Sequence, residues 1–238
     1  MMKYKQKNKL KEGKNMKNFE VIKKIKREIN TIGKIIRENL RWIFFCVCLI
    51  VFLKIVENIF ENEIHIFDSF VYHTIAIFIS TPVTFVMKLV TGMGSAIWLI
   101  GICMIALLLP KNKQYGKYMT INLVIITVLN QILKNIFNRP RPEGFRLIQE
   151  TGYSFPSGHS MISMAFYGFL IYIIYKKVKN PYLKWGSMTL LFTLIVANGI
   201  SRIYLGVHYA SDVIGGFCFS IAYLSVYTHF VSTAIERT

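Results

Sequence analysis

Six long apolar runs constrain the fold of this chain more than any other feature of its sequence. They cover residues 42–58, 94–110, 118–136, 160–176, 185–201 and 213–234. Their lengths approach the roughly 20 residues that an α-helix needs to cross the hydrocarbon core of a bilayer. A helix also satisfies its own backbone hydrogen bonds in lipid. The sequence therefore predicts an all-α, polytopic membrane protein with six transmembrane helices in one bundle.

The basic charge of the chain is concentrated ahead of the first run. The formal net charge is +17 at pH 7, and residues 1–41 hold fourteen Lys or Arg against four Glu. No pattern of a nucleic-acid recognition module accompanies this charge, so we expect no nucleic-acid partner. A basic segment beside apolar spans is typical of the cytoplasmic side of a membrane. We therefore divide the chain into a basic cytoplasmic arm, 1–41, and a membrane domain, 42–238.

The second half of the arm has the pattern of an amphipathic helix. Isoleucines recur at steps of three and four between Ile22 and Ile36, with Lys and Arg among them. Such a helix can lie on the anionic lipids of the inner leaflet. A solvated helix or a short coiled-coil partner would show the same pattern, and we favour the lipid interpretation.

Residues 64–91 are apolar enough to suggest a seventh span, but Pro82 interrupts them and Asp68 adds a charge. The basic segments 111–117 and 176–184 should both face the cytoplasm together with the arm. Only an even number of crossings before the first of these segments satisfies that condition. We therefore expect residues 64–91 to form an additional interfacial helical segment, or a re-entrant one, on the outer face.

With six spans, three polar clusters fall at the outer ends of the helices. They are Lys134–Pro142, Pro156–His159 and Ser201–Asp212. Ionisable residues at the ends of membrane spans indicate a functional site. We therefore expect the site to lie on the extracytoplasmic face of the cell membrane, with the N-terminus in the cytoplasm.

The second cluster has the features of an anion-binding helix start. Ser157 can cap a helix that begins after Pro156, and the free backbone N–H groups at such an end attract phosphate. Gly158 leaves the backbone open to an anion. His159 would then stand beside the anion and could donate a proton. A capped helix whose histidine merely meets water is the alternative.

Three cations accompany this helix start: Lys134, Arg141 and Arg202. They supply one point charge and two planar guanidinium groups, which suit an anion with several oxygens. Snorkelling of these side chains into lipid headgroups could account for one or two of them. It would not account for the histidines nearby.

His208 and Asp212 are four residues apart at the start of a predicted helix, so they share one face. Asp212 can accept the Nδ1 proton of His208, which leaves Nε2 free to act as a nucleophile or base. We expect His208, paired with Asp212, to hold a proton. The pair could also be half of a metal site that His159 completes. The three cations would repel a divalent ion, so we expect no metal and no other cofactor.

Together the three clusters resemble the motifs of the type 2 phosphatidic acid phosphatase superfamily, which also contains the vanadium haloperoxidases. These motifs are Lys-x6-Arg-Pro, Pro-Ser-Gly-His and Ser-Arg-x5-His-x3-Asp, and the chain carries all three in order within residues 134–212. The register of the first motif is unambiguous, because Lys134 stands seven residues before Arg141, whereas Ile132 stands seven before Arg139.

The resemblance implies that residues 42–238 are a membrane phosphatase domain whose site binds a lipid phosphate. In this interpretation the phosphate oxygens are bound by Lys134, Arg141 and Arg202, helped by Ser157 and the backbone N–H of Gly158. Fixed positive charge offsets the repulsion between a nucleophile and an anion that is already charged.

The resemblance also implies the chemical steps. His208 would attack phosphorus and form a phosphohistidine, Asp212 would orient His208, and His159 would protonate the leaving oxygen. Water would then hydrolyse the phosphoenzyme. Because one histidine acts as nucleophile and the other as acid, we expect a bell-shaped dependence of activity on pH.

The resemblance leaves the substrate open among phosphatidate, phosphatidylglycerol phosphate and a polyprenyl diphosphate. The Lys/Asn/Ile-rich composition is typical of a low-GC bacterium, so we favour a cell-envelope lipid, with the last two slightly ahead of phosphatidate. Two other classes of function remain as alternatives. One is a non-catalytic lipid-phosphate binder or flippase, and the other is a vanadate-using oxidase.

Overall fold

The computed structural model describes residues 27–29, 33, 39–110, 113–144 and 146–236. The chain divides into two compact units, Met1–Ile43 and Phe44–Thr238. Most of the basic arm, including most of its expected amphipathic helix, lies outside the described residues. The function of the arm therefore stays a prediction.

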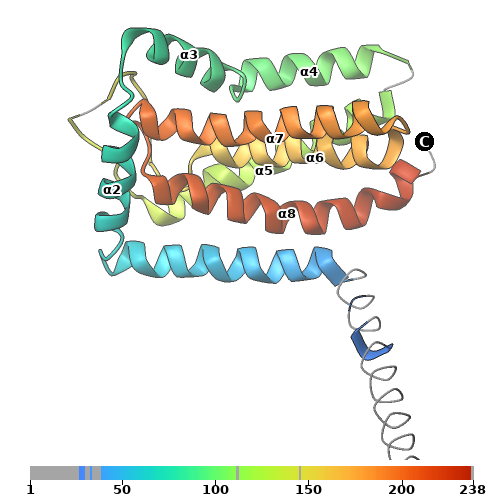
Figure 1. The fold of residues 1–238 in the computed structure, drawn as a ribbon, viewed down its shortest axis with the longest axis horizontal. Coiled ribbons are helices and arrows are strands. Elements are labelled where there is room, and N and C mark those ends of the chain that lie inside the picture. The colour runs from blue at the N-terminus through green and yellow to red at the C-terminus, as the bar shows by residue number, and fades with distance from the viewer. Residues whose placement is uncertain (1–26, 30–32, 34–38, 111–112, 145, 237–238) are drawn as a thin grey trace, which may run out of the picture. The chain divides into compact units, whose positions relative to one another are not determined.

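The second unit is built from helices that are long and apolar enough to cross a membrane (Figure 1). Five helices meet this condition within the described residues. They are Asn39–Phe60, α5 (Lys113–Phe137), α6 (Gly158–Lys177), α7 (Pro181–Tyr204) and α8 (Ala210–Glu236). The described residues contain helices and no strand. The prediction of an all-α polytopic membrane protein is confirmed.

Two short helices divide the segment that the sequence left ambiguous. α2 (His65–Ala76) and α3 (Thr81–Gly92) are bent by 119° at the break between them. Pro82 lies in the first turn of α3, where a helix tolerates proline because its missing N–H has no partner there. Figure 1 shows α2 across the ends of the long helices and α3 beside α7. Residues 64–91 are therefore two elements, and only α2 has the orientation expected for an interfacial helix.

The apolar run at 94–110 forms α4 (Ala96–Leu108), which has only 13 residues. Such a helix is about 20 Å long and cannot cross a 30 Å hydrocarbon core by itself. α3 and α4 follow one another along the same side of the bundle (Figure 1). The second crossing expected from the sequence is therefore not one long helix. Within the described residues five helices could cross a membrane, or six if the bent pair α2 and α3 counts as one span.

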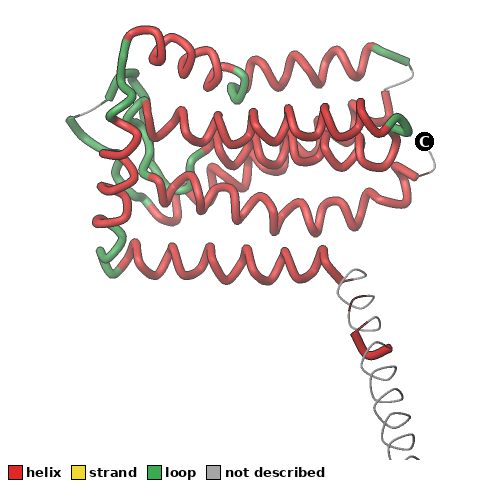
Figure 2. Tube along the Cα trace, viewed as in Figure 1, coloured by secondary structure: helices red, strands yellow, loops and turns green. Residues whose placement is uncertain are grey.

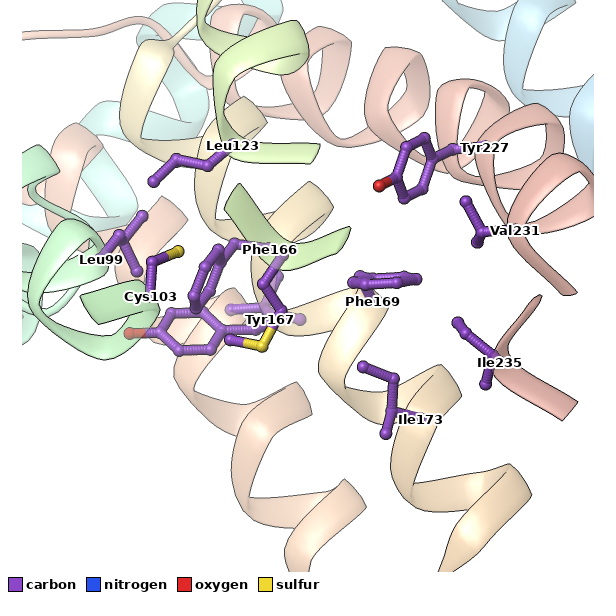
Figure 3. Packing of buried hydrophobic residues seen from close by; sticks show 12 residues of the cluster. Leu99, Cys103, Leu123, Phe166, Tyr167, Phe169, Ile173, Tyr227, Val231 and Ile235 are labelled. Carbon is purple, nitrogen blue, oxygen red and sulfur yellow. The ribbon is translucent and has the colours of Figure 1, made fainter. Parts of the chain in front are cut away.

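The apolar core of the bundle is centred on α6, which packs against α5, α7 and α8. Phe166 and Phe169 of α6 are fully buried, together with Leu99 of α4 (Figure 3). Cys103 and Tyr227 complete this part of the cluster from α4 and α8. The Tyr227 hydroxyl donates a 2.6 Å hydrogen bond to a backbone carbonyl of α5, so its polar end is satisfied inside the core.

The loop 138–157 and the turn 205–209 gather at the end of the bundle that α2 crosses (Figure 2). They are joined there by a 3.0 Å hydrogen bond from the Leu147 N–H to the Leu205 carbonyl. Phe155, next to the predicted helix start, stacks on Phe52 with ring centroids 5.7 Å apart. This packing fixes the loop directly before α6 and so positions the polar clusters.

Candidate active site

The start of α8 holds the predicted histidine and carboxylate pair. His208 Nδ1 lies 3.4 Å from Asp212 Oδ2, and both side chains are buried. The same Oδ2 accepts the backbone N–H of Tyr209 at 2.9 Å, while the Ser154 hydroxyl donates to it as well. Oδ2 therefore sits among donors that hold the carboxylate in place beside the imidazole.

The other ring nitrogen of His208 faces Arg141. Nε2 lies 3.1 Å from a terminal guanidinium nitrogen of Arg141, which also donates to the carbonyl of Val207 at 3.0 Å. The remaining Arg141 donors bind the carbonyls of Thr151 and Gly152. Because a guanidinium only donates, Nε2 acts as the acceptor and carries a lone pair. An anion bound by Arg141 would therefore lie close to this ring nitrogen.

Burial lowers the pKa of His208 to about 4, even though Asp212 acts in the opposite direction. The positive charges of Arg141 and Arg202 lower it further. Asp212 does favour the protonated form, but desolvation of the charged imidazolium is the larger contribution, so the expectation that the paired His208 would hold a proton is wrong. His208 is neutral at pH 7, which is the form that can attack phosphorus.

Arg202, in the last turn of α7, is almost completely buried. One terminal nitrogen donates to Thr91 Oγ1 at 2.8 Å, and the other pairs with the carboxylate of Glu150. Its buried Nε has no hydrogen-bond partner in the part of the chain that the structure describes. An unpaired donor in such a place is costly, and an oxygen of a bound anion would satisfy it.

Glu150 links the two arginines of the site. Besides its pair with Arg202, its other oxygen lies 3.9 Å from Arg141. Burial alone would raise the pKa of Glu150, but its attraction to Arg202 prevails and lowers it. The carboxylate is therefore an anion held between two guanidinium groups, which shows that an anion fits between them.

The helix start at α6 has the predicted form. Ser157 is the N-cap, and its hydroxyl accepts hydrogen bonds from the N–H and the hydroxyl of Ser160. A side chain at Gly158 would approach Asn130 Oδ1 to within 3.0 Å, so a small residue is also needed here for packing against α5. His159 follows in the first turn and experiences the charges of Arg202 and Glu150.

Lys134 reaches the same region from the last turn of α5. Its ammonium group donates to the carbonyl of Tyr153, four residues before Ser157. All eight sequence-predicted residues therefore lie at this end of the bundle, on α5, α6, α7, the start of α8 and the connecting loops. The three motifs, spread over 79 positions from Lys134 to Asp212, are brought together by the fold.

Sequence reasoning missed three residues that contact this group, Arg139, Glu150 and Ser154. It also missed Asp68, which contacts Arg139. In the sequence, Arg139 was considered only as an alternative register of the first motif, and it was rejected. In the structure it pairs with Asp212 at 2.7 Å. Asp68 was visible as a lone carboxylate in an apolar segment, and this isolation is the signal that could have identified it. Glu150 and Ser154 lie in a loop whose sequence carries no comparable signal.

The fold and the site define a class: an all-helical membrane protein with a histidine and several cations at one end of its bundle. Residues 115–236, just over half of the chain, match the PAP2 superfamily. The chain belongs to this superfamily. The resemblance inferred from the three motifs is thereby confirmed.

Two curated relatives illustrate the range of the similarity. The chain is 42% identical over 93 residues to phosphatidylglycerophosphatase B of Bacillus subtilis, which covers 38% of this chain and only 45% of that relative. It is 26% identical over 213 residues to an undecaprenyl-diphosphatase of Sulfolobus acidocaldarius, covering 85% of this chain and 94% of that relative.

Solved structures show the same fold. The structure of a transmembrane PAP2-type phosphatidylglycerolphosphate phosphatase from Bacillus subtilis superposes with a TM-score of 0.72 at 27% identity. The superposition covers 79% of this chain and 96% of that one. Aquifex aeolicus LpxE gives a TM-score of 0.53 at 23% identity, over 65% of this chain and 92% of that one, and supports the fold alone.

Proposed function

We propose that the chain is a membrane lipid phosphatase that hydrolyses a phosphomonoester or diphosphate of a bilayer lipid. The observation that carries this proposal is the convergence of a neutral histidine on a group of buried cations. Nε2 of His208 and the guanidinium of Arg141 are 3.1 Å apart, so one phosphate can contact both. The names of the curated and solved relatives agree with this class of substrate.

The first step transfers the phosphoryl group to the protein. Nε2 of His208 forms a bond to phosphorus while the bond from phosphorus to the leaving oxygen breaks, and His159 gives its proton to that oxygen. Asp212 accepts the Nδ1 hydrogen bond and stabilises the ring as it gains positive charge. Arg141, Arg202 and Lys134 bind the phosphate oxygens and neutralise the charge of the transition state.

The second step regenerates the histidine. Water attacks the phosphohistidine, His159 takes the proton from that water, and the bond between phosphorus and His208 breaks as inorganic phosphate leaves. This exchange of the roles of acid and base follows from microscopic reversibility. In our proposal the chemistry uses fixed cations and requires no metal.

The substrate is best sought among cell-envelope lipids. We favour phosphatidylglycerol phosphate or a polyprenyl diphosphate slightly over phosphatidate, and relatives named for the first two support this order. We further propose that the active site faces the outside of the cell membrane. The basic start of α5 and the basic end of α6 lie at the end of the bundle away from the site loops (Figure 1). This position supports the proposed orientation.

A role for residues 1–41 is also proposed from the sequence. We infer that this basic arm stays in the cytoplasm and binds anionic lipids of the inner leaflet. Binding of the purified arm-containing protein and of a variant lacking residues 1–38 to phosphatidylserine-containing vesicles tests this. Equal binding of the two at low salt would contradict the proposal.

Phosphate release from a panel of purified lipids tests the main proposal. The protein in detergent is assayed with phosphatidylglycerol phosphate, a polyprenyl diphosphate and phosphatidate, in the presence of EDTA. We expect release from at least one lipid. Binding without release would favour the lipid binder or flippase, and stimulation by vanadate would favour the oxidase.

Within the described ranges no group of three or more His, Cys, Asp or Glu side chains could hold a metal ion. Loss of activity in EDTA that Mg²⁺ or Zn²⁺ restores would overturn the metal-free chemistry.

A further inference from the structure

A carboxylate from α2 reaches the first turn of α8. Asp68 is only 3% exposed, and its Oδ1 accepts the backbone N–H of Ser211 at 2.8 Å. Its Oδ2 accepts the Ser211 hydroxyl at 2.7 Å. The first N–H groups of a helix have no partner within the helix, so Asp68 caps α8 from a distant part of the chain. Asp212 is the next residue of that same turn.

Arg139 connects Asp68 to Asp212. Its two terminal nitrogens donate to Asp68 Oδ2 at 2.8 Å and to Asp212 Oδ1 at 2.7 Å. The Arg139 side chain is 7% exposed and lies over the ring of Tyr209, with 4.2 Å between the guanidinium carbon and the ring centroid. The guanidinium is thus fixed between two buried carboxylates and an aromatic face.

This arrangement divides the two oxygens of Asp212 between different tasks. Oδ1 is occupied by Arg139, which leaves Oδ2 for His208 Nδ1 and for the donors beside it. The charges of Asp68, Arg139 and Asp212 add up to one negative charge behind the imidazole. That charge stabilises the positive ring that forms during phosphoryl transfer.

We propose that Asp68 and Arg139 are positioning residues for the nucleophile, which act on His208 by fixing the orientation and the net charge of Asp212. The inference deepens the proposed phosphatase function and rests on it for the catalytic step. It assigns α2, a helix outside the three sequence motifs, a direct part in the active site. Asp68 and His208 both line a cavity of about 270 Å³ between α2 and the loop region, so the two side chains belong to the same part of the molecule.

Docking of α2 alone does not require this ion pair. Val71, Tyr72 and Ile75 of α2 already pack on the apolar side chains of Ile203 and Val213. A buried ion pair is often no more stabilising than well-packed apolar residues of the same size. Two carboxylates and an arginine therefore suggest a function in the chemistry next to them.

The inference predicts opposite changes in the protonation of His208. Removing the negative charge of Asp68 leaves Arg139 less neutralised, which should lower the pKa of His208. Removing the positive charge of Arg139 should raise it. Charged or titratable groups around His208 on the elements packed against it are Asp212, Tyr209, Arg141, Glu143, Glu150, Lys134, His159, Arg202, His65, Tyr72 and His73. None of these residues is itself substituted, although Asp212 and Tyr209 each lose a contact in Arg139→Gln.

The experiment compares Asp68→Asn with Arg139→Gln. The chain has five histidines, so the ¹⁵N signals of His208 can be assigned by their loss in a His208→Gln variant. We expect the His208 titration to move to lower pH in Asp68→Asn and to higher pH in Arg139→Gln. This measurement does not need enzymatic activity, so it remains informative if the phosphatase proposal fails. Absence of any hydrolysis by the unmodified protein would reject that proposal separately.

The kinetic arm uses the lipid that the unmodified protein hydrolyses. We expect Asp68→Asn to lower kcat about tenfold with little change in KM, as the loss of an outer hydrogen-bonded partner does at other sites. Thr84→Val is the matched control, because it removes the 2.9 Å hydrogen bond between α3 and Tyr204 without changing charge. We expect it to leave kcat unchanged.

Two outcomes would overturn the inference. One is a titration of His208 that is unchanged in Asp68→Asn, and the other is an equal loss of kcat in Asp68→Asn and Thr84→Val. Arg139→Gln leaves two buried carboxylates without a cation and can unfold the protein. Asp68→Asn, which leaves Arg139 paired with Asp212, then decides the question by its His208 titration.

Discussion

At the scale of single residues, Glu150 is the carboxylate that lies between the two arginines of the site. Its carboxylate pairs with Arg202 and is 28% exposed, so it can move aside when a phosphate binds. We expect Glu150→Gln to lower the inhibition constant of inorganic phosphate about tenfold, the equivalent of one charge-assisted hydrogen bond. Competition kinetics with inorganic phosphate measures this. An unchanged or weaker inhibition would mean that Glu150 does not compete with the substrate.

The nucleophile gives the sharpest test of the proposed chemistry. We expect His208→Ala to lower turnover on the order of 10⁶-fold, the effect of removing a nucleophile in other enzymes. The helices around it should remain folded, and thermal unfolding in detergent checks this. Appreciable phosphate release by a folded variant would show that another residue attacks phosphorus.

The pH dependence should reflect the buried state of His208. A histidine must be neutral to attack, and burial lowers the pKa of His208 to about 4 from an ordinary value of about 6.5. We therefore expect protonation of His208 to cause no fall in kcat/KM near pH 6.5, and to lower kcat/KM only as the pH approaches 4. Profiles with two substrates of different phosphate pKa separate the titration of the enzyme from that of the substrate. A limb at pH 6.5 with both substrates would contradict this prediction.

At the scale of elements, the approach of α4 to α5 depends on one glycine. A Cβ at Gly116 would lie 2.8 Å from the backbone of Ala106 and Leu107, and backbone cannot move aside as a flexible side chain can. We expect Gly116→Ala to lower the free energy of unfolding by roughly 1–3 kcal/mol, the usual cost of overpacking. Thermal unfolding in detergent measures the change.

Gly101 provides the matched control for this substitution. It lies in α4, and a Cβ there would meet nothing within 4 Å. Gly101→Ala should therefore be neutral, or stabilising by up to about 1 kcal/mol, because alanine favours the helix. Similar losses in both variants would show that helix contact is not what Gly116 provides.

At the scale of the whole molecule, the proposed sidedness can be measured in intact cells. A cysteine at Glu143, in the site loop, should react with a membrane-impermeant maleimide, whereas one at Lys113 should not. The four native cysteines are first replaced by Ala, since Cys46 is exposed on its helix. Labelling at 113 but not at 143 would place the active site in the cytoplasm.

The sequence by itself determined the class of fold and most of the site. Apolar runs of membrane length allow little except helices, because lipid offers no partner for backbone polar groups. The motif residues could be found since their spacing is fixed along the chain, as in the four-residue step from His208 to Asp212. The cap at Ser157 was predictable for the same reason, because capping is a local interaction.

Only the tertiary structure decided how residues 64–110 divide into helices and which residues complete the site. α2 and α3 meet at a bend of 119° and α3 packs against α7, and hydropathy alone reports neither a bend nor a packing partner. Asp68 meets Ser211 across 143 positions, and Arg139 joins Asp68 to Asp212. Contacts of this kind leave no periodicity in the sequence. The partners are far apart along the chain, and only the folded chain brings them together.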